Sequence, residues 1–88
     1  MNVVIDLSHA DTRDSFHDAF VQALSLPDWY GRNLDALHDA LTALGEETCL
    51  TLQNWNVPET NLGNYAKAAQ RAIRHAAQRN SNLTVEFC

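Results

Sequence analysis

The side chains with the clearest capacity for shared chemistry are two aspartates and a histidine close together in the sequence, Asp35, His38 and Asp39. A carboxylate pair can act as general acid and base, and a histidine beside a carboxylate can bind a metal ion. A metal site needs further ligands, and the remaining histidines are scattered and are expected at the surface: His9, His17 and His75. We therefore expect no metal site.

Residues 34–44 are predicted to form the helix that carries this cluster, with Asn33 as its N-cap and Gly45 as its stop. Its four leucines fall within an arc of roughly 80° and are expected to face the core. The opposite arc holds only four side chains: Asp35, His38, Asp39 and Thr42. Two like charges spaced i, i+4 cost only a few tenths of a kcal/mol. The pair alone is therefore compatible with a solvated face as well as with a binding surface.

The loop before this helix contains two adjacent aromatic residues, Trp29 and Tyr30, followed by Gly31. At most one of two consecutive residues usually points fully into a core. We expect the other to be partly exposed beside the acidic face, and an aromatic next to a carboxylate is typical of a protein-binding surface. The alternative is that both aromatics fold back onto a small core.

The apolar patterns predict an α/β protein with the element order β-α-α-β-α-β, in one domain spanning residues 1–88. Strands are predicted over residues 2–7, 49–53 and 83–87, and helices over 12–24, 34–44 and 64–79. The first strand is rich in β-branched residues and is expected to be buried. The stretch NWNVPETNLGN is predicted to be a polar connection. Strands separated by helices imply right-handed crossovers and a parallel sheet.

The net charge of −5 is unevenly distributed along the chain. Residues 1–59 carry ten acidic side chains against two arginines, whereas residues 60–88 carry one glutamate against four basic side chains. The acidic part would repel nucleic acid and attract a basic partner, and the arginines of the last helix are too sparse to indicate nucleic-acid binding.

The chain shows no sign of membrane insertion, export or metal-binding cysteines. No apolar run approaches the ~18–20 residues that span a bilayer, and the first residues lack the basic region of a signal peptide. The two cysteines, Cys49 and Cys88, have neither metal-binding nor redox spacing. We expect a cytoplasmic protein with two free thiols and no membrane contact.

Over residues 26–42, LPDWYGRNLDALHDALT, the chain resembles the barstar family of intracellular ribonuclease inhibitors. The shared features are an aromatic residue followed by glycine, an asparagine cap and two aspartates in fixed register. The resemblance implies a small barstar-like fold, a three-stranded parallel sheet with helices packed on it. It further implies a protein that is not an enzyme, has no cofactor and is a monomer when free. Its implied function is to inhibit a small basic ribonuclease, barnase-like or of another guanyl-specific type, as an immunity or antitoxin-like protein.

The resemblance also implies roles for individual residues. Asp39 would fill the enzyme's pocket for the scissile phosphate, and Asp35 would meet basic groups at its rim. The other residues implied to contact the partner come from the loop, the helix and two later positions: Trp29, Tyr30, Gly31, Asn33, His38, Thr42, Glu46 and His75.

Three positions depart from the family pattern and make the surface less acidic. His38 stands where the family has a tryptophan, Arg32 where it has a glutamate, and His75 where it has an acidic contact residue. These departures imply a related inhibitor for a different nuclease, one with fewer basic groups or with an acidic group facing Arg32 or His75. The alternative is a barstar-like interaction module with a non-nuclease partner.

Overall fold

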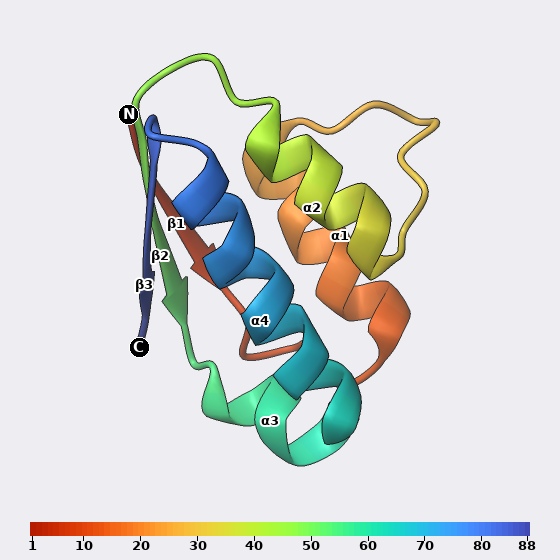
Figure 1. Ribbon diagram of the computed structural model, residues 1–88. Helices are drawn as coiled ribbons and strands as arrows, with labels where there is room; N and C mark the ends of the chain where they lie inside the picture. The colour runs from red at the N-terminus through yellow and green to blue at the C-terminus, as the bar shows by residue number, and fades with distance from the viewer.

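The chain folds into three strands and four helices (Figure 1). Three of the helices and the three strands follow the order predicted from the sequence, and the fourth helix is a short one that was not predicted. The computed structural model describes all 88 residues. The elements are β1 (Asn2–Asp6), α1 (Arg13–Leu24), α2 (Leu34–Thr42), β2 (Thr48–Gln53), α3 (Asn56–Leu62), α4 (Asn64–Arg79) and β3 (Leu83–Phe87). The predicted α/β class and strand–helix alternation are confirmed.

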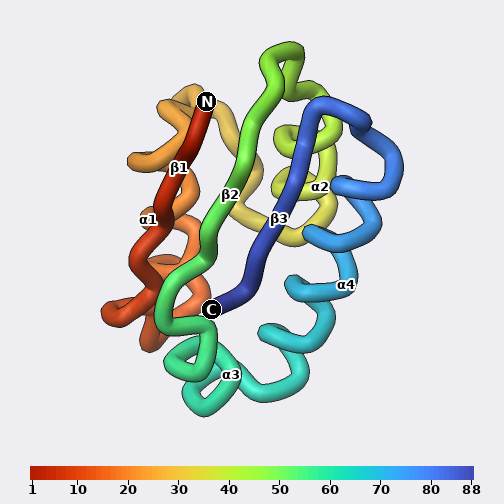
Figure 2. Tube along the Cα trace, turned by 90° about the vertical axis from the view of Figure 1, so that its left-hand side faces the viewer, coloured from red at the N-terminus to blue at the C-terminus, as the bar shows by residue number.

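The sheet is parallel, with the strand order β1-β2-β3 and Ile5 opposite Leu52 in the register. Helices cover only one of its faces, and Figure 2 views the strands from the uncovered side. Parallel sheets are usually covered on both faces. The expectation of a buried first strand is therefore wrong for half of its residues. Ile5 is buried, but Val4 points to the open face and is 56% exposed.

The core lies between the covered face of the sheet and α1, α2 and α4. Phe16 and Phe20 of α1, Leu37 and Leu41 of α2, and Ile73 of α4 are all fully buried. The apolar residues predicted to be buried in each helix thus face the sheet or a neighbouring helix. Small residues of α4 permit the close packing of α2 against it, which fixes the position of the acidic helix.

The stretch predicted as a polar connection contains α3, so that prediction is wrong for residues 56–62. Pro58 lies in the first turn of this helix, where a missing backbone N–H costs no intrahelical hydrogen bond. No side chain caps its N-terminus. Burial of Trp55 and Pro58 against the core holds the helix in place.

Both cysteines are free and exposed, as expected from their spacing. Cys49 lies on the open face of β2, and Cys88 follows β3. No helix in the structure combines the length and the apolar character needed to cross a bilayer.

Candidate partner-binding surface

The acidic helix α2 presents its carboxylates to solvent. Asn33 caps its N-terminus by accepting a hydrogen bond from the backbone N–H of Ala36 at 2.8 Å. Leu37 and Leu41 are buried on one side of the helix, so that Asp35 and Asp39 point outward from the other. The Asp39 side chain is 86% exposed. Such exposure provides no desolvation to tune the two carboxylates for acid/base catalysis.

The loop before α2 places one aromatic residue in the core and the other in solvent. Trp29 is 85% exposed, whereas Tyr30 is only 8% exposed. This confirms that the two aromatic residues divide between surface and core, and it rules out the alternative in which both fold inward. The exposed member is Trp29.

An apolar hollow of about 460 Å³ lies between this loop and α2. Its lining is Leu26, Pro27, Trp29, Tyr30, Gly31, Ala36, Asp39, Ala40 and Ala43. Asp39 is the only charged residue among them, so a carboxylate stands at the edge of an otherwise apolar surface. Gly31 permits the loop to lie close to α2, because a Cβ added at this position would lie only 3.1 Å from the Cβ of Ala36.

A buried chain of hydrogen bonds ties the loop to two helices. His17 of α1 bonds to the Tyr30 hydroxyl through Nδ1 at 2.8 Å and to the Tyr65 hydroxyl of α4 through Nε2 at 2.7 Å. His17 is 1% exposed, so the expectation of a surface histidine is wrong. Burial lowers the pKa of His17 and raises the pKa of Tyr30 to about 12. With the imidazole neutral, one tyrosine donates to it and the other accepts from it.

Arg32, the only basic residue of the loop, is turned toward α1. Its guanidinium donates to the Asp18 carboxylate at 2.7 Å and to the Asp14 carbonyl at 2.8 Å. The hydrogen bond that Arg32 donates to the Asp18 carboxylate raises the pKa of the guanidinium above its ordinary value. The arginine therefore neutralises acidic groups of α1, and no arginine or lysine forms an ion pair with Asp35 or Asp39.

The structure brings together His38 of α2 and His75 of α4, a pairing between two helices that was not predicted from the sequence. Nε2 of His38 and Nδ1 of His75 are 2.8 Å apart. The planes of the two rings are inclined by only 24°. On the other side of the His38 ring, Nδ1 lies 3.9 Å from an Asp39 carboxylate oxygen.

The remaining expected contact residues lie near the C-terminal end of α2. Thr42 is half-buried, and its hydroxyl donates to the Asp39 carbonyl at 3.1 Å. Glu46 is exposed in the turn before β2, where its carbonyl accepts from the Thr48 hydroxyl. The exposed members of the expected set thus lie on the loop, on α2, in the turn before β2 and on α4, whereas Tyr30 is largely buried in the core and does not present its ring to a partner. The structure also adds two positioning residues that were not expected, His17 and Tyr65.

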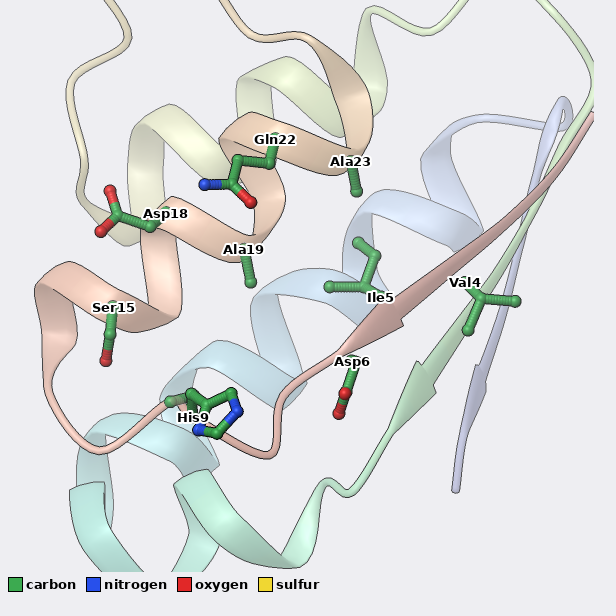
Figure 3. Close-up of a pocket in the computed structure, with 10 residues that line it drawn as sticks. Val4, Ile5, Asp6, His9, Ser15, Asp18, Ala19, Gln22 and Ala23 are labelled. Carbon is green, nitrogen blue, oxygen red and sulfur yellow. The ribbon is translucent and has the colours of Figure 1, made fainter.

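A second hollow, also of about 460 Å³, lies between β1 and α1 and contains residue types used in hydrolytic enzymes (Figure 3). The hydrogen bonds of these side chains stabilise the fold and do not link them to one another. The Ser15 hydroxyl belongs to the capping interaction with Thr12, and the Asp18 carboxylate holds Arg32. The His9 ring makes no hydrogen bond to either of them, so these side chains are not connected as a nucleophile, base and orienting acid would be.

The fold and the surface together define a small α/β protein with exposed carboxylates on α2 and an exposed tryptophan in the preceding loop. A family model described as Barstar (barnase inhibitor) matches residues 1–88. The chain is 36% identical over 77 residues to a Bacillus subtilis (strain 168) protein named "Putative ribonuclease inhibitor YrdF". That alignment covers 86% of this chain and 85% of the relative. The chain belongs to the barstar family.

Proposed function

We propose that this protein inhibits a small basic ribonuclease by inserting the acidic face of α2 into the enzyme's active site. The description of the family as barnase inhibitor, and the name of the Bacillus subtilis relative, support a ribonuclease as partner. The ribonuclease proposed is barnase-like or of another guanyl-specific type. Inhibition would take place in the cytoplasm, as an immunity or antitoxin function, without enzymatic activity of the inhibitor itself.

The observation that carries the proposal is that Asp35 and Asp39 are exposed and have no arginine or lysine partner within the protein. Basic groups of an enzyme that binds phosphates can pair with these carboxylates without displacing an internal cation. By contrast, the Asp18 carboxylate is already paired with Arg32 at 2.7 Å. Both carboxylates of α2 are therefore available to a partner.

The apolar hollow beside Asp39 supplies the second part of the proposed contact. Trp29 is a large aromatic that is already exposed in the free protein, so its burial by a partner gains apolar contact area. Closing this surface around Asp39 also removes water from the ion pair, which strengthens the attraction between the charges. The proposed contact thus combines an aromatic anchor with a carboxylate whose surroundings become drier on binding.

An inhibition titration tests the proposal. Increasing amounts of the protein are added to a guanyl-specific microbial ribonuclease, and cleavage of a fluorescent RNA is followed. We expect stoichiometric inhibition. Asp39→Asn should weaken it by at least about thirtyfold, which corresponds to about 2 kcal/mol of binding free energy.

Glu59→Gln is the matched control, because Glu59 is also an exposed acid, on α3, and the substitution removes the same charge. Its effect on inhibition should be less than about threefold. Equal losses for the two variants would reject α2 as the inhibitory face. Tight binding to a different basic protein without inhibition of any ribonuclease would favour the interaction-module alternative.

A further inference from the structure

We infer that Asp39, His38 and His75 form a polarised chain that holds both imidazoles with their protons on Nδ1 and leaves Nε2 of His75 as an exposed hydrogen-bond acceptor. This row of three side chains runs from α2 to α4, and it lies between the acidic face of α2 and the exposed arginines of α4. The inference deepens the proposed function, because it assigns a specificity-determining group to the same binding surface.

The direction of the hydrogen bonds follows from the acidic end of the chain. The Asp39 carboxylate oxygen is 3.9 Å from Nδ1 of His38, and its negative charge favours a proton on that nitrogen. A neutral imidazole then has a lone pair on Nε2. The contact of 2.8 Å between the two rings requires a donor, so Nδ1 of His75 must carry the proton. The remaining nitrogen of His75, Nε2, consequently carries a lone pair.

The basic end of the chain favours the same direction. Arg71 and Arg79 are exposed and lie one turn before and one turn after His75 on α4, so they are its neighbours on the helix surface. Positive charges on both sides favour a lone pair at Nε2 of His75. Arg74 does not contribute in the same way, because its guanidinium lies over the Phe87 ring, 4.7 Å from the centroid.

This arrangement specifies what the partner must offer at the α4 end of the surface. In the neutral chain, Nε2 of His75 accepts a hydrogen bond, so it suits a donor such as an arginine, a lysine or a backbone N–H. A proton added to the chain turns Nε2 into a donor and places positive charge beside Asp35 and Asp39. Loss of the acceptor at position 75 should therefore weaken the binding of a partner that offers a donor there.

The tautomer can be measured in the free protein, without any partner. Long-range proton–nitrogen correlation spectra of the ¹⁵N-labelled protein at about pH 8 distinguish protonated from unprotonated ring nitrogens. We expect Nδ1 to be protonated in both His38 and His75. His9 is the internal control, because its ring makes no hydrogen bond and should show the Nε2–H form that free imidazole prefers. His38→Ala should return His75 to the same behaviour as His9. A proton on Nε2 of His75 in the unmodified protein would overturn the inference.

The second measurement rests on the proposed function. Dissociation constants for the ribonuclease are compared at about pH 8 between the unmodified protein, His75→Gln and His75→Leu. Glutamine offers an acceptor oxygen, whereas leucine offers none. His75→Leu should bind roughly threefold more weakly, the size expected for one exposed hydrogen bond, and His75→Gln should retain most of the affinity. Equal affinities for all three proteins would contradict a role of His75 in the contact. If the protein binds no ribonuclease, the proposed function fails and the tautomer measurement alone decides the inference.

Discussion

His17 connects the exposed loop to the core, so its protonation should affect the stability of the fold. The imidazole is buried between the hydroxyls of Tyr30 and Tyr65, and burial lowers its pKa below the ordinary value of 6.5. The unfolded chain therefore binds a proton at a higher pH than the folded protein does. The contribution of His17 to the free energy of unfolding is complete above about pH 6.5 and decreases as the pH falls toward the lowered pKa.

Urea unfolding at about pH 7.5 and pH 5 tests this prediction, with His17→Gln as the comparison, since glutamine can bond to a tyrosine but does not titrate. The unmodified protein should lose more free energy of unfolding on acidification than the variant, because the other ionisable groups are the same in both. An equal loss in the two proteins would show that the protonation of His17 is not linked to folding.

The division between Trp29 and Tyr30 illustrates what residue types alone could predict. Two adjacent aromatics in a loop predict one inward and one outward side chain, and this prediction is confirmed. Which of them turns inward depends on His17, which lies on a different element and supplies the hydrogen-bond partner of the Tyr30 hydroxyl. The pairing of His38 with His75 has the same origin, because it depends on how α2 packs against α4.

Among the elements, the loop between α1 and α2 owes its conformation to contacts with the neighbouring helices. Tyr30→Phe removes the hydroxyl that bonds to His17 and leaves a buried ring nitrogen without a partner. Such a loss costs about 1–3 kcal/mol of the free energy of unfolding. Hydrogen exchange should become faster at the loop amides, including that of Tyr30, which donates to the Pro27 carbonyl at 3.0 Å.

Tyr65→Phe is the control for this change, because it removes the hydroxyl at the other end of the same imidazole. Both variants should be destabilised when unfolding is measured in urea. Only Tyr30→Phe should accelerate exchange in the loop relative to the rest of the protein. If both variants accelerated it equally, the loop would owe its conformation to the core as a whole rather than to the Tyr30 hydroxyl.

The three helices with regular apolar spacing could be predicted from the sequence, and α3 could not. α1, α2 and α4 carry N-cap residues or helix-favouring alanines together with regular apolar spacing. α3 has seven residues, no side-chain cap and a proline within its first turn. Such a sequence has little tendency to form an isolated helix, and the burial of Trp55 and Pro58 supplies the stabilisation from outside the segment.

At the scale of the whole molecule, helices cover only one face of the sheet, and this determines on which side of the molecule the charged side chains of the helices lie. One face of the sheet is not covered by helices, while the opposite side of the molecule is formed by the helices (Figure 2). The sequence showed an acidic excess over residues 1–59 but not its location. In the folded protein, Arg32 offsets part of the charge of α1, and Asp35 and Asp39 remain available on α2.

This distribution predicts that association with a basic ribonuclease is accelerated by long-range attraction and is sensitive to salt. The association rate constant, measured by stopped-flow fluorescence, should fall by at least about tenfold between about 20 mM and 500 mM salt, since the screening length shortens from about 20 Å to about 4 Å. Asp35→Asn should lower the rate at low salt and reduce its salt dependence. Lys67→Gln removes a charge of opposite sign from the outer surface of α4 and should raise the rate slightly at low salt. A rate that is insensitive to salt, or equal decreases for the two variants, would mean that the charge of α2 does not guide the encounter.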